Sequence, residues 1–193
     1  MANKLFPFVV KDIISNPVKA WETIDPEIKP VSEIRNRLLF PLIFTVSVSA
    51  TAGSLLFTNS QLSPVFSVFT GIKCFFLFYI TIYATALILK EITYPLGLGK
   101  SFNISFWLIV YSVVPFLLCQ VLSRLFESLL FVDVLALYGL YIFWTGAERL
   151  LAPSKNKKVP LLIASIVAFT GIYIAINFLL TKLIDKLYFI FFS

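Results

Sequence analysis

The most constraining feature of the sequence is residues 96–122, where a short polar loop leads into a charge-free apolar run. The run is about as long as the roughly twenty helical residues that cross the hydrocarbon core of a bilayer. Near its middle, Pro115 follows Tyr111 by one helical turn. A proline inside a helix cannot donate an amide hydrogen bond, so it frees one carbonyl and bends the chain. The run therefore predicts a bent transmembrane helix.

The composition extends this prediction to the whole chain. Hydrophobic residues make up 59% of the 193 residues, charged residues make up 13%, and the mean hydropathy is +0.93. A soluble domain of this length cannot bury so much apolar surface. The net charge of +6 would suggest a nucleic-acid partner for a soluble protein, but the basic residues here lie beside the apolar runs. We therefore expect an all-α polytopic membrane protein with no nucleic-acid partner.

The apolar runs divide the chain into expected spans. A cytosolic segment over residues 1–37 is expected to precede a transmembrane domain over residues 38–193. The expected spans are residues 38–57, 66–89, 102–122, 129–144 and 159–180. The fourth would rise only about 24 Å as an α-helix, so it needs flanking apolar residues or a locally thinner bilayer. An aromatic-rich tail after the fifth is expected at the membrane interface. The sequence thus predicts a bundle of five transmembrane helices.

The N-terminal segment shows the spacing of an amphipathic helix. Its apolar residues recur at helical intervals at Phe6, Val9, Val10, Ile13 and Ile14. Pro17 can occupy the first position of a second short helix, which carries Trp21. Two placements remain open: the segment lies in the lipid interface, or it packs against the cytosolic ends of the spans.

The lysines and arginines predict the orientation. With the N-terminus inside, the internal segments carry twelve basic residues: Lys4, Lys11, Lys19, Lys29, Arg35, Arg37, Lys90, Lys100, Arg149, Lys155, Lys157 and Lys158. The external segments carry three: Arg124, Lys182 and Lys186. Because basic residues are retained on the cytosolic side, the N-terminus is expected inside and the C-terminus outside.

Polar side chains inside the spans are the candidate functional residues. Lys73, Gln120, Asp133 and Asn177 all fall in the outward half of the expected bundle, where they are predicted to form a small polar cluster. Lys73 and Asp133 lie at similar depths, so we expect them to form an ion pair. The alternative is that Lys73 snorkels to the outer surface and that Asp133 lies in a shallow first turn.

Residues that carry catalysis or bind metals are scarce. The sequence contains no histidine, and Cys74 and Cys119 stand alone inside apolar runs, where a packed thiol is the ordinary role. Residues 97–101 read GLGKS, like the end of a phosphate-binding loop, but Tyr94 replaces the first glycine of that motif. No nucleophile with a base and no carboxylate pair is visible in the spans. We therefore expect a non-enzyme without a cofactor or a metal site.

Four segments together resemble the Yip domain family of small membrane proteins, in its prokaryotic branch. They are NPVKAWETI (residues 16–24), GLGKSFN (residues 97–103), YSVVPFLL (residues 111–118) and YGLYIFWTGAERL (residues 138–150). The resemblance implies a five-span bundle with a cytosolic N-terminus, in the bacterial cytoplasmic (inner) membrane. Pro17, Tyr111, Pro115 and Gly146 match family preferences, and the last three are candidates for kinks and helix packing.

The resemblance also bears on partners. Eukaryotic relatives resemble partners of Rab-type GTPases, but their Asp-Leu-Tyr-Gly-Pro and Gly-Tyr-Gly motifs are not evident here, so a GTPase partner is not expected. The first hypothesis is a non-enzymatic organiser or adaptor whose partners are membrane lipids, other membrane proteins or a second copy of the chain in a homo-oligomer. The alternative is a small-solute transporter or an outward-facing ligand- or lipid-binding membrane protein. A transporter requires a continuous polar path, and none is visible in the inner half of the spans.

Overall fold

The computed structural model describes residues 6–22, 30–57, 64–99 and 101–192. The elements are α1 (Phe6–Ser15), α2 (Pro17–Glu22), α3 (Val31–Ile34), the π-helical turn η1 (Arg35–Leu39), α4 (Phe40–Phe57), α5 (Pro64–Thr93), α6 (Phe102–Ser112), α7 (Val114–Leu125), the 3₁₀ segment η2 (Glu127–Leu137), α8 (Tyr138–Leu150) and α9 (Lys155–Phe192). These described residues contain helices and no strand, which confirms the all-α prediction.

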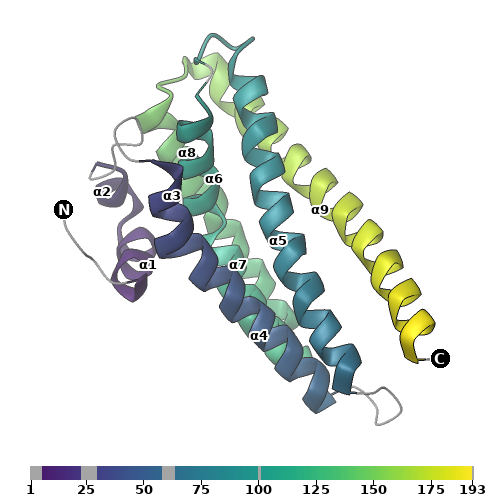
Figure 1. Cartoon of the computed structure of the whole chain (residues 1–193). Helices are drawn as coiled ribbons and strands as arrows, with labels where there is room; N and C mark the ends of the chain where they lie inside the picture. Colours follow the sequence, from purple (N-terminus) through teal and green to yellow (C-terminus); the bar gives the residue numbers. More distant parts are fainter. Residues whose placement is uncertain (1–5, 23–29, 58–63, 100, 193) are drawn as a thin grey trace.

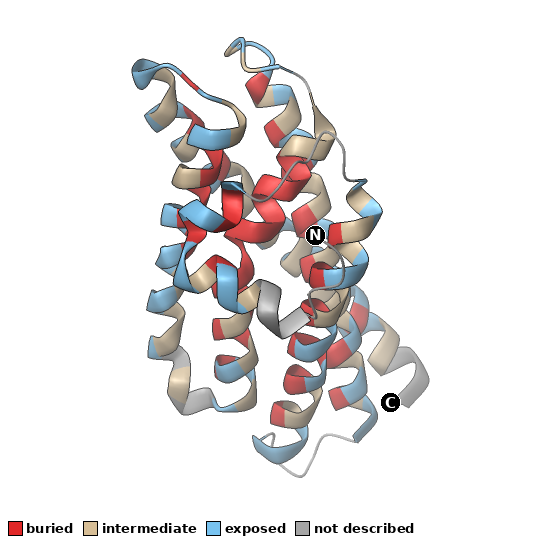
Figure 2. Ribbon diagram, turned by 90° about the vertical axis from the view of Figure 1, so that its left-hand side faces the viewer, coloured by how far each residue is buried: buried red, intermediate tan, exposed pale blue. Residues whose placement is uncertain are grey.

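The long helices run side by side along one axis (Figure 1). α4 leads away from the N-terminal helices and α5 returns beside it. α6 and α7 lead away again, η2 and α8 return, and α9 extends along the whole bundle. Buried residues, red in Figure 2, gather in the middle of the bundle. Residues 105–115, which run from α6 across the break into α7, are buried without interruption.

Three helical stretches of the described chain are long and apolar enough to cross a membrane: Val31–Phe57, Pro64–Thr93 and Lys155–Tyr188. The bent pair Phe102–Ser112 and Val114–Leu125 makes a fourth when it is counted as one span. These helices correspond to the first, second, fifth and third expected spans. The protein is therefore a helical, multi-span membrane protein.

The expected fourth span is not a continuous α-helix. The described chain forms η2 first and continues as α8, with a break in helical geometry at Leu129. A 3₁₀ helix rises about 2.0 Å per residue against 1.5 Å for an α-helix, so the part of η2 after the break at Leu129 is roughly 16 Å long. The more extended geometry lets this short apolar run reach further than its length in α-helical residues suggests.

Two boundaries also differ from the sequence prediction. The first long helix begins at Val31, directly after Pro30, so it includes residues 31–37 of the expected cytosolic segment. At the other end, residues 181–192 continue α9 instead of forming a separate tail. As a helix of 38 residues, α9 is about 57 Å long, so it must project beyond the hydrocarbon core.

The chain bends between α6 and α7. The two helices meet at an angle of 42°, and the break lies at Val113, two residues before Pro115. Pro115 has no amide proton to donate to the carbonyl of Tyr111, the residue four positions earlier. The amide of Val113 still donates to the carbonyl of Ile109, at 3.0 Å, so regular bonding is kept up to the break.

The N-terminal helices pack against the bundle at a site that we call the Trp21 site, formed by Trp21, Leu108, Tyr111, Ile142 and Gly146. The Trp21 side chain is only 1% exposed, and its Nε1 donates to the carbonyl of Ile142 at 3.1 Å. Its ring centroid lies 5.2 Å from that of Tyr111. A Cβ added to Gly146 would meet two ring atoms of Trp21 at 2.5 Å, so only glycine leaves room for the indole. The sequence left open whether the N-terminal segment lies in the lipid interface or packs against the spans, and α2 packs against the spans.

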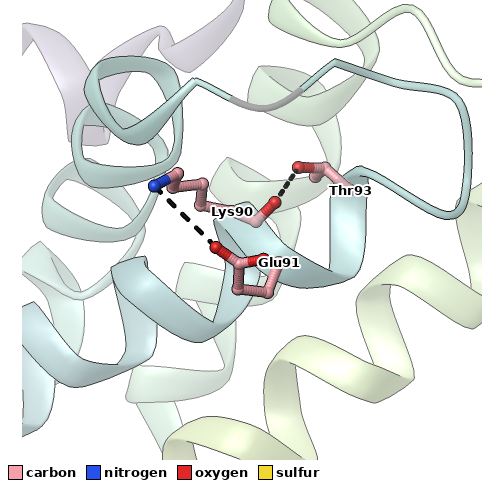
Figure 3. Close-up of polar contacts among 3 residues, drawn as sticks. All are labelled: Lys90, Glu91 and Thr93. Atoms are coloured by element: carbon pink, nitrogen blue, oxygen red, sulfur yellow. Dashed lines mark hydrogen bonds and ion pairs between the residues drawn. The ribbon is translucent and has the colours of Figure 1, made fainter.

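The connection from α5 to α6 is held to the start of α9 through one of its own backbone carbonyls. At the end of α5, the hydroxyl of Thr93 donates to the carbonyl of Lys90 at 2.9 Å, while the Lys90 ammonium lies 3.8 Å from the Glu91 carboxylate (Figure 3). Lys157 of α9 donates to the carbonyl of Leu96 at 2.7 Å. Lys157 thus ties the chain to α9 at Leu96, one residue before the GLGKS sequence, whose Lys100 lies outside the described residues.

Candidate polar cavity

A polar cavity of about 770 Å³ lies at the end of the bundle where α4 and α5 meet, away from the N-terminal helices (Figure 1). We call it the Arg124 cavity. Its lining comes from α4, α5, α7, η2 and α9: Ala50, Gly53, Ser54, Phe66, Thr70, Gln120, Ser123, Arg124, Asp133 and Tyr173.

The close approach of α4 to α7 forms one wall. A Cβ added to Gly53 would lie 1.9 Å from the carbonyl oxygen of Arg124, so the two backbones touch at this glycine. Glycine permits such contact because it has no side chain, and small residues at helix interfaces allow close packing within membranes. The wall therefore depends on the absence of a side chain at position 53.

The turn between α7 and η2 brings Asp133 into the cavity. The chain leaves α7 through the extended residue Phe126 and η2 then runs back along α7. The carboxylate of Asp133 accepts from Gln120 Nε2, at 3.3 Å to each oxygen. The hydroxyl of Ser123 lies 3.1 Å from Oδ1 of Asp133 and 3.0 Å from the carbonyl of Cys119, and its one proton is shared between these acceptors. Asp133 is thus fixed by neutral donors of α7.

Gln120 also connects Asp133 to a cation. Arg124 Nε donates to Gln120 Oε1 at 3.1 Å, and Arg124 Nη2 lies 3.4 Å from the hydroxyl oxygen of Tyr173. Gln120 is 6% exposed, so its amide is held inside the protein. The result is a chain of hydrogen bonds, from guanidinium to amide to carboxylate, along one side of the cavity.

Tyr173 marks the boundary between the polar cavity and an aromatic layer. Its hydroxyl faces Arg124, while its ring centroid lies 6.0 Å from that of Phe78, 6.2 Å from Phe116 and 6.4 Å from Phe169. Phe78 is fully buried. Tyr173 therefore joins the lining of the cavity to an aromatic cluster inside the bundle.

The structure brings together only part of the predicted cluster. Gln120 and Asp133 meet, but no hydrogen bond or ion pair joins Lys73 to Asp133, both of which are described. The charged groups that act on the half-buried Lys73 are Arg124 and Asp185. Equal depth did not lead to pairing, because η2 folds back onto α7 and Asp133 meets Gln120 and Ser123 there.

Asn177 lies one helical turn after Tyr173 on α9 and is not among the described residues that line the cavity. Its carbonyl accepts from the hydroxyl of Thr181 at 2.7 Å. Tyr111 and Gly146 belong to the Trp21 site, and Pro115 follows the bend before α7. These candidates lie in the structural parts of the bundle, away from the Arg124 cavity.

Sequence reasoning missed Ser123, Arg124 and Tyr173. The first two had a signal, because Gln120, Ser123 and Arg124 follow the i, i+3, i+4 spacing that places residues on one helical face. Hydropathy ended the third span at Leu122, whereas α7 continues to Leu125. Tyr173 had no comparable signal, since an aromatic residue in an apolar run is common. Among the described residues, no group of three or more His, Cys, Asp or Glu could hold a metal ion.

Comparison with known proteins gives one match. The family model described as the Yip1 domain matches residues 11–177, which include the whole cavity lining and the Trp21 site. The match confirms the family expected from the four sequence segments. No curated protein and no solved structure matches the chain.

Proposed function

The chain belongs to the Yip1 domain family, and from this premise we propose that it is a non-enzymatic membrane protein that organises lipids by holding a phospholipid headgroup in the Arg124 cavity. The observation that carries the proposal is a cavity of about 770 Å³ that is lined by the amide of Gln120, the carboxylate of Asp133 and the guanidinium of Arg124, beside apolar surface of Ala50 and Phe66. Binding sites combine enclosed volume with a few converging polar groups, and the lining of this cavity provides both. The headgroup would occupy the polar walls, and Phe66 and Ala50 offer apolar surface to the adjoining glycerol and chain carbons.

We further propose that the protein crosses the membrane five times, with η2 and α8 together forming the fourth crossing. The described basic residues Lys90, Arg149, Lys155, Lys157 and Lys158 lie near the ends of α5 and α8 and the start of α9, opposite the cavity. If those ends face the cytosol, as the positive-inside rule requires, the cavity opens at the outer leaflet of the bacterial cytoplasmic membrane. Its depth would then match that of phospholipid headgroups.

Transport of a small solute is the second candidate, and the packing beyond Tyr173 argues against it. A permeation path needs polar groups or water across the full bilayer. The bundle interior beyond the cavity contains Phe78, Ile82, Val114 and Leu117, which are all fully buried. These side chains leave a one-ended site, which suits binding better than passage.

The test compares two threonines with the same local bonding. Thr70 lines the cavity and donates to the carbonyl of Phe66 at 3.0 Å. Thr45 is exposed on α4 and donates to the carbonyl of Pro41 at 2.8 Å. We expect Thr70→Phe to fill the cavity and to reduce the phospholipid that co-purifies in mild detergent by about tenfold or more, measured by native mass spectrometry. Thr45→Phe is the matched control and should retain the wild-type amount.

Two results would overturn the proposal. One is a wild-type protein that co-purifies without phospholipid and gains no thermal stability when phospholipid is added. The other is Thr70→Phe protein that keeps as much lipid as the Thr45→Phe control. Solute uptake by proteoliposomes that depends on the wild-type protein would instead support the transport alternative.

A further inference from the structure

The Arg124 cavity presents two opposite charges that are held apart. Arg124 and Asp133 both line it, and no ion pair joins these two described residues. The amide of Gln120 stands between them, accepting from Arg124 through its oxygen and donating to Asp133 through its nitrogen. Because only 6% of Gln120 is exposed, the packing around it holds the amide between the two charged groups. The guanidinium of Arg124 and the carboxylate of Asp133 therefore face the same cavity without pairing with each other.

We propose that the cavity recognises a zwitterionic headgroup, one that carries a primary ammonium beside a phosphate, with the phosphate at Arg124 and the ammonium at Asp133. This inference rests on the proposed headgroup site and names the class of lipid that it holds. The charge order of the cavity, cation then anion, is the complement of the charge order of such a headgroup.

The hydrogen-bonding capacity of each residue fits this assignment. A guanidinium has five N–H donors, and the bonds from Arg124 to Gln120 and Tyr173 use two of them. The remaining donors can bind phosphate oxygens, for which the guanidinium fork is well suited. A carboxylate has about four acceptor positions, and Gln120 and Ser123 occupy three at Asp133. One position remains for a charged donor.

Other headgroup classes fit less well. A headgroup whose only charge is its phosphate would satisfy Arg124 but would offer no cation to Asp133, so the repulsion between the phosphate and that carboxylate would stay uncompensated. A neutral sugar or glycerol headgroup would leave both charges without a partner.

The experiment measures binding of four probes to delipidated full-length protein in detergent by thermal shift and native mass spectrometry. The probes are phosphatidylethanolamine, phosphatidylglycerol with the same acyl chains, phosphatidylethanolamine acylated on its nitrogen, and soluble phosphoethanolamine. We expect phosphatidylethanolamine to bind at least about tenfold more tightly than phosphatidylglycerol and the N-acylated lipid, because only phosphatidylethanolamine carries both a phosphate and a free ammonium. Soluble phosphoethanolamine should bind more weakly than the lipid, since it lacks the apolar part that Phe66 and Ala50 contact.

Variants separate the roles of the two charges. Asp133→Asn should remove the preference, leaving the ethanolamine and glycerol lipids within about threefold of each other, whereas Arg124→Gln should weaken both by about tenfold. Lys182→Gln is the control, because this exposed charged residue of α9 does not line the cavity among the described residues. The control variant should keep the wild-type preference.

Each contrary result has a distinct meaning. If the wild type binds phosphatidylglycerol as tightly as phosphatidylethanolamine, the zwitterionic preference is refuted and the headgroup site stands. If it binds neither lipid, both proposals fail. If soluble phosphoethanolamine binds as tightly as the lipid, the charge assignment holds but the lipid source is refuted. If Asp133→Asn keeps the full preference, Asp133 is not the ammonium partner and the assignment is overturned.

Discussion

The Trp21 site and the Arg124 cavity lie towards opposite ends of one bundle, and they differ in how the helices pack around a glycine. Each joins helices that are distant in sequence, and each contains a glycine at a close contact, Gly146 in the first and Gly53 in the second. At the Trp21 site a large indole fills the space left by the glycine, and its one polar atom has a partner. At the Arg124 cavity the backbones touch, and about 770 Å³ beside them remains open.

The difference separates structural packing from ligand recognition. Protein interiors are close-packed, so a buried tryptophan with no space around it contributes stability. The Arg124 cavity instead leaves a carboxylate and a guanidinium facing open volume with hydrogen-bonding capacity to spare, so a ligand with complementary charges can bind there. The loosely packed Arg124 cavity, and not the densely packed Trp21 site, is therefore the candidate for ligand binding.

The largest expected effect comes from emptying the Trp21 site. Trp21→Ala should lower the free energy of unfolding by about 3–5 kcal/mol, because it leaves a cavity between α6 and α8 and removes the bond to Ile142. Chemical or thermal unfolding in detergent would measure the loss. The control is Trp144→Ala, since Trp144 is half-buried with its ring 5.9 Å from the Lys158 ammonium; its loss should be about 1 kcal/mol or less. Equal losses for both tryptophans would contradict the packing role of Trp21.

A smaller loss is expected when the glycine contact at the other end is broken. Gly53→Ala places a methyl group on the carbonyl of Arg124, so α4 and α7 must separate, at an expected loss of about 1–3 kcal/mol in unfolding free energy. Because the change lies beside the cavity, retained phospholipid should fall as well. The solvent accessibility of Trp21, measured by fluorescence quenching in a protein whose Trp107 and Trp144 are replaced by Phe, should stay at its value without the Gly53 change. Increased quenching of Trp21 would show that a change at the Arg124 cavity alters the Trp21 site, and it would contradict the independence of the two regions.

Much of the fold was predictable because hydropathy and charge act through simple periods and lengths. Apolar runs located the long helices α4, α5 and α9 and the bent α6–α7 pair, and the missing amide of Pro115 gave a reason for the bend. The 3₁₀ geometry of η2 was not predictable, since an apolar run constrains composition and length and not the pitch of the helix. The place of Trp21 was only one of two alternatives, because its partners come from α6 and α8.

The candidate site was predictable in part. Gln120 and Asp133 stood out as polar residues in apolar runs, and they do meet across the turn between α7 and η2. Lys73 shares their depth but does not pair with Asp133, because depth along a helix does not determine the face on which a residue lies. Arg124 was assigned to a loop because the apolar run ends before it, whereas the helix continues through it.

Removing the amide between the two charges tests whether Gln120 separates them. Gln120→Leu should lower the free energy of unfolding by about 1–2 kcal/mol, since Asp133 keeps only the donor Ser123 and Arg124 keeps only the acceptor Tyr173. The variant should also lose the preference between headgroups, because Arg124 and Asp133 become free to approach each other. Binding of the ethanolamine and glycerol lipids to the variant gives the measurement. A variant with wild-type stability and preference would show that the amide has no separating role.

The smallest effect is expected at Gly171, an exposed position of α9 that belongs neither to the Trp21 site nor to the lining of the Arg124 cavity. A Cβ added to Gly171 would have no heavy atom within 4 Å, so the position is open, unlike Gly53 and Gly146. Glycine in a helix interior carries extra unfolded-state entropy, so Gly171→Ala should raise the free energy of unfolding by about 0.4–1 kcal/mol. Retained phospholipid and Trp21 quenching should stay unchanged. A loss of stability would mean that this face of α9 packs closely against another chain or a second copy, and the Gly53→Ala result would then need the same correction before it is attributed to the contact between α4 and α7.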